Sequence, residues 1–150
     1  MKYKITILIL LFFISSLIFF DFCMAGEIKS FGKINKQSIN VSFLELTANP
    51  ELYHNKQIRL IGVMKLEIEG NSIFLSKEHY QYDVTRNAFW ISLSPLLEKQ
   101  KAEIKKLNGK YVLLEGIFKK DRKGHMGLYM GTITNINRII DYEAAFKYRT

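Results

Sequence analysis

The sequence predicts an all-β domain with accessory helices, in which one helix separates the third of five strands from the fourth. Apolar and polar residues alternate in five segments after residue 56, which is the period of a strand. Between residues 95 and 107 the apolar spacing becomes that of a helix, and a helix start signal precedes the first strand. The length of 150 residues suits one domain, and 48% hydrophobic with 24% charged residues is a globular balance.

A short helix is expected before the first strand. Ser42-Phe43-Leu44-Glu45 matches a capping box, in which the Ser42 side chain binds a free amide and Glu45 reaches back to the Ser42 N–H. Pro50 suits the first position of a further helical turn, because its missing N–H is not needed there. Residues 26–40 are polar and have no sustained period, so they are interpreted as a linker.

The strand pattern places apolar side chains on one side of each segment. In the third segment Phe89, Ile91 and Leu93 share a side, so Trp90 is expected to point the other way. In the first segment the shared side carries Ile58, Leu60, Met64 and Leu66. The five expected strands are Gln57–Leu66, Ser72–Ser76, Ala88–Leu93, Tyr111–Phe118 and Gly127–Ile140.

One helix is expected between the third and fourth strands. Ser94-Pro95 begins it and Asn108-Gly109 ends it, both typical helix boundaries. Its apolar stripe consists of Leu97, Ile104 and Leu107, which are therefore expected to be buried. Residues 141–150 follow the last strand and are interpreted as a C-terminal tail.

Two of the strands share the pattern K-x-[IV]-x-L-x-G, at Lys56–Gly62 and Lys110–Gly116. A glycine inside a strand indicates a sharp bend, so each is expected where a small sheet coils onto itself. With five strands, a helix between the third and fourth, and this opening pattern, the sequence resembles the oligonucleotide/oligosaccharide-binding (OB) fold. It is most similar to small exported bacterial OB-fold proteins and to the tRNA-anticodon-like OB families.

The resemblance implies a five-stranded Greek-key barrel over residues 41–140, with a helix between strands three and four and a short helix before strand one. Proteins of this fold bind nucleic acids, glycans, small cations or other proteins. The resemblance therefore implies an architecture, and it does not choose among these ligands.

The amino end is typical of an export signal. Lys2 and Lys4 precede sixteen uncharged residues, and Ala25 supplies a small residue at the expected cleavage position, so residues 1–25 are interpreted as a signal peptide. The expected location is periplasmic or secreted. An uncleaved membrane anchor is the alternative, because the apolar run is just short of the roughly 17–25 residues that span a bilayer. Lipid attachment at Cys23 is less favoured, because the preceding residues are not small.

The loop between the last two strands is strongly basic, since residues 119–125 read KKDRKGH. OB barrels usually bind ligands on strands two and three and on the flanking loops, including the loop between strands four and five. Cations among aromatic rings suit phosphates, sulfates and stacked rings, although such a loop also serves simply as a solvated hairpin tip. The candidate ligand-binding residues are Lys119, Lys120, Arg122, Lys123, His125, Tyr129, Trp90, Tyr80, Tyr82 and Arg86.

Two of these residues have alternative roles. Trp90 is either a ligand platform or a side chain packed under the leading helix. His125 either contacts an anion or metal or bonds a nearby backbone group. Met126 and Met130 are interpreted as packing residues.

The sequence gives little support to catalysis. His54, His79 and His125 lie in different segments without the H-x-x-x-H spacing of a zinc site, and no phosphate-binding P-loop or G-x-S-x-G is present. No catalytic residue, metal or cofactor is therefore predicted.

The net charge of +8 favours anionic partners. We therefore expect an exported, non-catalytic binding protein for an anionic ligand of the cell envelope, which would be a glycan, a phospholipid or a nucleic acid. A protein–protein module, such as a secreted-enzyme inhibitor or an immunity-like factor, is the alternative. An envelope hydrolase is the third possibility.

Overall fold

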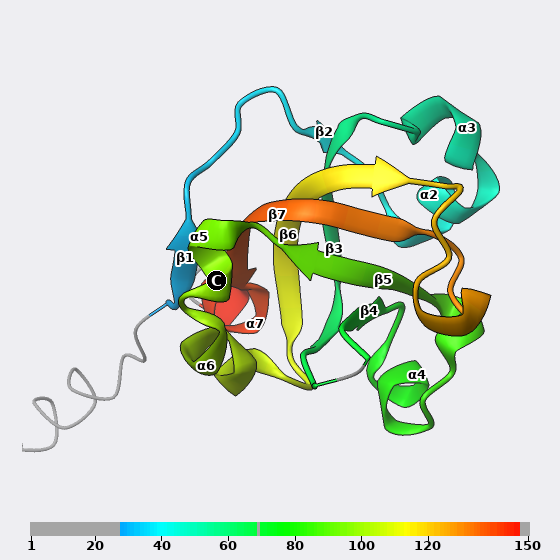
Figure 1. Ribbon diagram of the computed structural model, residues 1–150. Helices are drawn as coiled ribbons and strands as arrows, with labels where there is room; N and C mark the ends of the chain where they lie inside the picture. Colours follow the sequence, from blue (N-terminus) through cyan, green and yellow to red (C-terminus); the bar gives the residue numbers. More distant parts are fainter. Residues whose placement is uncertain (1–27, 69, 148–150) are drawn as a thin grey trace, which may run out of the picture.

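A closed barrel of five strands forms the centre of the molecule (Figure 1). The computed structural model describes residues 28–68 and 70–147, so the expected signal peptide lies outside the described residues. The barrel strands are β3 (Gln57–Lys65), β4 (Ser72–Phe74), β5 (Ala88–Leu93), β6 (Tyr111–Lys119) and β7 (Thr132–Asp141). They pair in the order β3–β4–β5–β7–β6, and β6 closes the barrel on β3. The β5–β7 pair is parallel and the other four are antiparallel, and the predominantly β prediction is confirmed.

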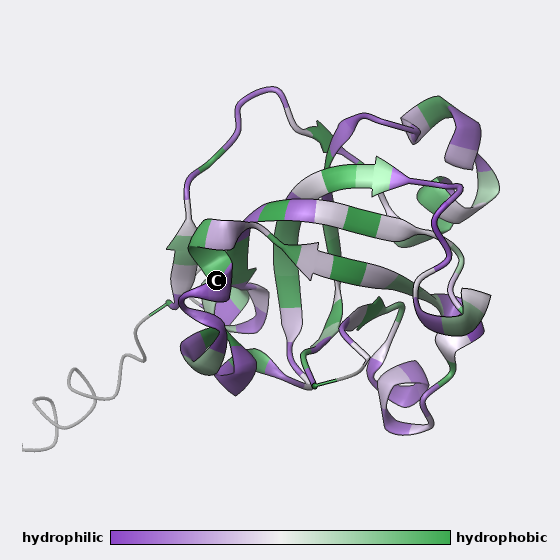
Figure 2. Cartoon of the chain, viewed as in Figure 1, coloured by the Kyte–Doolittle hydropathy of each residue, from purple (hydrophilic) through white to green (hydrophobic). Residues whose placement is uncertain are grey.

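The apolar side of each barrel strand fills one core. Ile58, Leu60 and Met64 on β3 are fully buried, and so is Ile91 on β5. Figure 2 shows the resulting alternation of hydrophobic and polar bands along β5 and β7. The period-two pattern thus predicted the inward side chains of these strands.

The two strand glycines allow neighbouring strands to approach closely. Lys56–Gly62 and Lys110–Gly116 face each other across the β3–β6 pair, with Leu60 opposite Leu114. A Cβ atom at Gly62 would lie 2.7 Å from the Phe74 carbonyl oxygen of β4, and one at Gly116 would lie 2.9 Å from the Thr134 carbonyl oxygen of β7. A side chain at either position would therefore collide with the backbone of the neighbouring strand, which explains why both residues are glycine.

The segment interpreted as a linker adds two short strands to the barrel. β1 (Ser30–Gly32) pairs antiparallel with β7, and β2 (Ile39–Asn40) pairs parallel with β3. Both pairings use backbone groups of a polar segment. The strands β1 and β2 therefore have no hydrophobic period from which they could have been predicted.

Two short helices precede β3, namely α2 (Phe43–Ala48) and α3 (Pro50–Tyr53). The Ser42 hydroxyl accepts a hydrogen bond from the Glu45 N–H at 3.1 Å, so this half of the capping box is confirmed. The Glu45 carboxylate instead accepts a hydrogen bond from the Tyr53 hydroxyl, which raises the pKa of Tyr53. The turn at Pro50 brings Tyr53 back to Glu45, and this tertiary contact replaces the local one.

The single helix expected over residues 95–107 is divided into three pieces. They are α5 (Pro95–Glu98), α6 (Lys101–Ile104) and the 3₁₀ turn η2 (Lys105–Leu107). The chain between α5 and α6 has only charged and polar side chains, and so short a helix is not stable without packing. Leu97, Ile104 and Leu107 are fully buried, as predicted.

The last strand begins later than predicted. Residues 127–131 belong to the loop before β7, because Gly127 has a positive φ angle and the Tyr129 and Met130 N–H groups donate to the Lys123 and Ala88 carbonyls instead of to β6. The segment interpreted as a tail contains α7 (Tyr142–Lys147) after β7. Between β4 and β5 the chain forms α4 (Lys77–Gln81) and the 3₁₀ turn η1 (Thr85–Asn87).

A buried carboxylate fastens the N-terminal segment to the barrel. Glu115 on β6 is fully buried and lies between Arg59 on β3 and Arg138 on β7, each of which donates to one carboxylate oxygen at 2.9 Å. The other oxygen accepts hydrogen bonds from the Asn35 N–H at 2.8 Å and the Ser38 hydroxyl at 3.2 Å. Burial alone would raise the pKa of Glu115, but these hydrogen bonds and charges outweigh burial and lower it.

Candidate anion-binding site

The basic loop joins β6 to β7 and is anchored at both ends. The Thr132 hydroxyl donates to the Arg122 carbonyl at 2.7 Å, and the Tyr129 N–H donates to the Lys123 carbonyl at 3.1 Å. Gly124 packs so tightly that a Cβ atom there would lie 2.7 Å from the Trp90 Cβ. The loop is therefore held against the barrel at its base, while residues 121–128 are exposed.

Two of the four cations in this loop are engaged by neighbouring segments. Lys119 donates to the side-chain oxygen of Asn55, and Lys120 forms an ion pair with Glu51 on α3. The Lys120 N–H also donates to His54 Nδ1 at 3.2 Å. These contacts fix the start of the loop against the leading helices, so Lys119 and Lys120 have structural roles.

The other two cations are available to a ligand. Arg122 and Lys123 are exposed, and their side chains have no hydrogen-bond or ion-pair partner within residues 28–68 and 70–147. His125 is exposed next to them, at the start of the 3₁₀ turn η3 (His125–Gly127). This part of the loop thus presents one guanidinium and one ammonium group to solvent, and such groups bind phosphate and sulfate.

Trp90 and Tyr129 pack against each other beneath the loop. Their ring centroids are 5.3 Å apart with planes at 71°, and Tyr129 is only 7% exposed. Burial, followed by the nearby Asp83 carboxylate, raises the pKa of Tyr129. Trp90 therefore packs under the β6–β7 loop, where Gly124 and Tyr129 contact it, and it stays half-buried.

Of the candidate residues after β4, Tyr80 packs inward and Tyr82 does not. Tyr80 on α4 packs edge-on against Phe74, with ring centroids 6.0 Å apart, whereas Tyr82 is exposed. Arg86 lies in η1. Tyr80, Trp90 and Tyr129 all pack in one cluster with Phe74, so the structure brings Tyr80 into the same cluster as the aromatic pair under the basic loop.

A polar depression of about 510 Å³ lies beside Tyr80 and includes several charged groups. Lys65 is paired with Asp83 at 2.8 Å, and Lys77 is paired with Glu143 at 2.7 Å. Because its cations already have carboxylate partners, this depression has less capacity for an added anion than the loop has.

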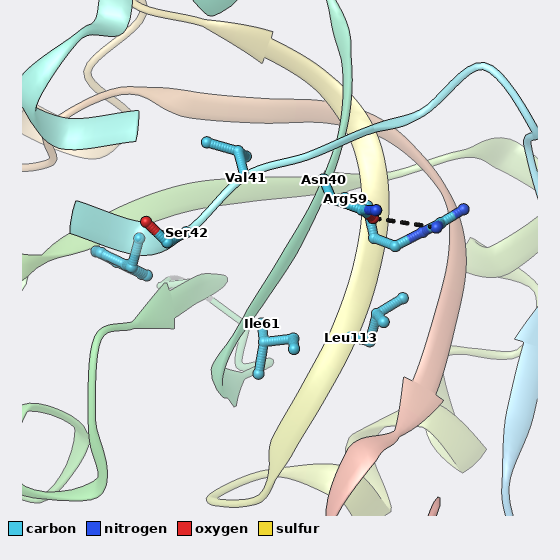
Figure 3. A pocket seen from close by; sticks show the side chains of 7 residues that line it. Asn40, Val41, Ser42, Arg59, Ile61 and Leu113 are labelled. Carbon is cyan, nitrogen blue, oxygen red and sulfur yellow. Dashed lines mark hydrogen bonds between the residues drawn. The ribbon is translucent and has the colours of Figure 1, made fainter. Parts of the chain in front are cut away.

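Sequence reasoning missed an apolar groove on the outer side of β3 and β6. Figure 3 shows Arg59, Ile61 and Leu113 around its floor, with Arg59 donating to the Asn40 side chain at 3.1 Å. The groove has a volume of about 400 Å³, and a second hollow of about 500 Å³ continues from Ile61 to Phe146 on α7. Ile61 is the residue from which the groove could have been predicted. It is apolar, yet the period-two pattern places it on the side of β3 that faces away from the core.

The histidines do not assemble into a site. His54 lies 3.9 Å from Asp121, while His79 Nδ1 lies 2.8 Å from the Ser76 hydroxyl at the start of α4. Over the part of the chain that the structure describes, no three His, Cys, Asp or Glu side chains are grouped to hold a metal ion. Among the same residues, no helix combines the length and the apolar character needed to cross a bilayer.

Comparisons with protein-family models, with curated proteins and with solved structures give no match for this chain.

Proposed function

We propose that this chain is an exported, non-catalytic binding protein that docks an anionic ligand or surface of the cell envelope through its β6–β7 loop. The observation that carries the proposal is the pair Arg122 and Lys123, which are exposed and have no side-chain partner among the described residues. The loop is fixed at its base by Thr132 and Tyr129, so its backbone needs little ordering when a ligand binds.

We also propose that the barrel is an OB fold. The strand order β3–β4–β5–β7–β6 with a parallel β5–β7 pair supports this assignment, as does the helical segment between β5 and β6. In that fold the β6–β7 loop is one of the two loops that flank the usual ligand face. An OB fold would make this loop a usual place for a ligand. The proposed class of ligand, an anion, is inferred from the side chains of the loop and not from the fold.

Export rests on the sequence of residues 1–25. Their two lysines, apolar run and Ala25 support cleavage before Gly26 and a periplasmic or secreted location. Intact-mass measurement of the protein recovered from the cell envelope or medium tests this. A mass that includes residues 1–25 would indicate an anchor, and an added lipid on Cys23 would indicate a lipoprotein.

Titration with a soluble polyanion, for example heparin or polyphosphate, over a series of salt concentrations tests the binding proposal. Arg122→Ala/Lys123→Ala should weaken binding and flatten the salt dependence by about one unit of logarithmic slope per lost phosphate-like contact. Lys99→Ala/Lys105→Ala is the matched control, because it removes the same charge from the segment between β5 and β6. Equal losses in the two variants would contradict a site at the loop.

A protein partner is the second candidate, and the observation that favours it is the exposed apolar tip of the same loop. Met126 is 80% exposed, so its interpretation as a packing residue is wrong, and Leu128 is 45% exposed. An inhibitor-like interface centred on these side chains would weaken much less with salt than a polyanion complex does.

A further inference from the structure

The tip of the β6–β7 loop combines exposed apolar side chains with cations that have no partner. Met126 and Leu128 are 80% and 45% exposed, and Arg122 and Lys123 precede them in the same loop. Exposed apolar residues are common on proteins, but here they accompany basic side chains that are free within the described residues. The combination of exposed apolar and basic side chains therefore indicates a binding surface more strongly than either feature does alone.

The backbone holds Met126 in this exposed position. Its φ angle is 52°, in the left-handed region that few residues other than glycine adopt, and Gly124 and Gly127 on either side also have positive φ. At the base, Gly124 is packed against Trp90 and Tyr129. An apolar side chain is thus presented to solvent by a strained and anchored turn, and such strain often marks a binding element.

An anionic lipid surface fits this arrangement better than a soluble polyanion does. In a bilayer the phosphate groups lie at the surface and the acyl boundary lies just below, so basic and apolar side chains on one tip are bound together. A glycan or nucleic acid offers phosphates, sulfates or rings but no apolar layer for Met126 and Leu128.

We propose that the β6–β7 loop docks on anionic phospholipid membranes, with Met126 and Leu128 entering the interface and Arg122 and Lys123 binding lipid phosphates. This inference rests on the proposed function, of which it names the ligand class. The soluble polyanion titration described above tests the loop as an anion site independently of lipid.

Trp90 provides a direct test, because it is the only tryptophan of the chain and lies beneath the loop. Its fluorescence is measured with vesicles of phosphatidylcholine, with or without phosphatidylglycerol, whose acyl chains carry bromine as a quencher. All variants are compared as the full chain in the form that the cell produces. Quenching of Trp90 reports the approach of the loop itself to the acyl layer, whether or not the amino end is also attached to the membrane.

We expect quenching with phosphatidylglycerol vesicles and much less without that lipid. Arg122→Ala/Lys123→Ala should reduce the affinity about fivefold per cation, as expected for basic residues near an anionic surface. Met126→Ser/Leu128→Ser should reduce it by about tenfold or more while leaving the charge unchanged. An unchanged unfolding midpoint, measured for each variant, shows that these losses do not come from unfolding.

Two matched controls separate the loop from general properties of the surface. Lys99→Ala/Lys105→Ala removes the same charge, and Ile68→Ser/Leu96→Ser removes two other exposed apolar side chains. Both should bind and quench as the unaltered chain does. Quenching that persists in Met126→Ser/Leu128→Ser, or that falls equally in the controls, would overturn the proposal.

The failure of this inference can be distinguished from failure of the proposed function. If soluble polyanions need Arg122 and Lys123 but vesicles give no quenching, the loop binds anions and the lipid assignment is wrong. If neither ligand depends on these two residues, both proposals are wrong.

Discussion

Glu115 and the β6–β7 loop are both charged regions of the same hairpin, yet their surroundings differ completely. Glu115 lies in the middle of β6, is fully buried and accepts four hydrogen bonds, two of them from arginines. Arg122 and Lys123 follow the end of β6, are exposed and have no side-chain partner within the described residues. A charge buried with its partners specifies the fold, whereas a charge left exposed on an anchored loop is available for a ligand.

Lys119 and Lys120 resemble Glu115 in having side-chain partners within the fold. They precede Arg122 and Lys123 in one basic run, but they contact Asn55 and Glu51 near the leading helices. Within this one basic run, the first two cations therefore contact the rest of the protein and the last two are available to a ligand.

The largest expected effect on stability comes from placing a carboxylate where no hydrogen-bond donors surround it. Ile104 on α6 is fully buried in the core, and Ile104→Asp should lower the free energy of unfolding by about 4 kcal/mol or more. Urea unfolding measures the change. Lys105→Asp, at the exposed neighbouring position, is the control and should change stability little. Similar stabilities for the two variants would mean that α6 does not pack on the barrel.

Removing the carboxylate that does have donors should have the next largest effect. Glu115→Gln keeps the size of the side chain but leaves Arg59 and Arg138 together without a counter-charge, which should cost about 3 kcal/mol. Glutamine has one acceptor oxygen where glutamate has two, and the two arginines compete for it, so hydrogen exchange of residues 33–38 should accelerate as well. Glu98→Gln, in an exposed pair with Lys101, is the control and should cost under about 0.5 kcal/mol.

Acid should weaken the same contacts without a substitution. The pKa of Glu115 is lowered in the folded protein, so its contribution is present above the unfolded pKa of about 4.3 and is lost as the pH falls through the folded value. Asp141 behaves in the same direction, because hydrogen bonds from Lys110 and the Ala144 N–H outweigh burial and lower its pKa. In urea unfolding at several pH values, the difference between the unaltered chain and Glu115→Gln should narrow below about pH 4. A constant difference would show that the charge of Glu115 does not stabilise the fold.

Local patterns in the sequence predicted much of the barrel. The period-two segments predicted the inward residues, and Ser42 predicted the start of α2. Each of these depends on residues close in the chain or on the side-chain period alone. The strands β1 and β2 were missed because their pairing uses backbone groups, and the break before α6 depends on which side chains reach the barrel.

The candidate site was predictable only in part. Its basic residues are consecutive in the sequence, but the residues that they contact are distant in the sequence. The run of basic residues was visible in the sequence, but the partners of Lys119 and Lys120 lie 64 and 69 residues away. The contact of Trp90 with Tyr129 likewise joins β5 to the loop and has no sequence signal. Glu115 was overlooked for the same reason, since Arg59 and Arg138 lie on other strands.

The smallest expected effect on stability belongs to the cations proposed to bind the ligand. Arg122→Ala/Lys123→Ala should change the free energy of unfolding by less than about 0.5 kcal/mol, because both side chains are exposed and lack partners among the described residues. Lys119→Ala/Lys120→Ala removes the same charge from the same loop but also breaks the contacts with Asn55 and Glu51, so it should cost more. Urea unfolding of the two variants at one salt concentration therefore compares structural with available cations directly. If Arg122→Ala/Lys123→Ala proves to be the more destabilising of the two, those cations support the fold, and the distinction drawn between the two halves of the loop is wrong.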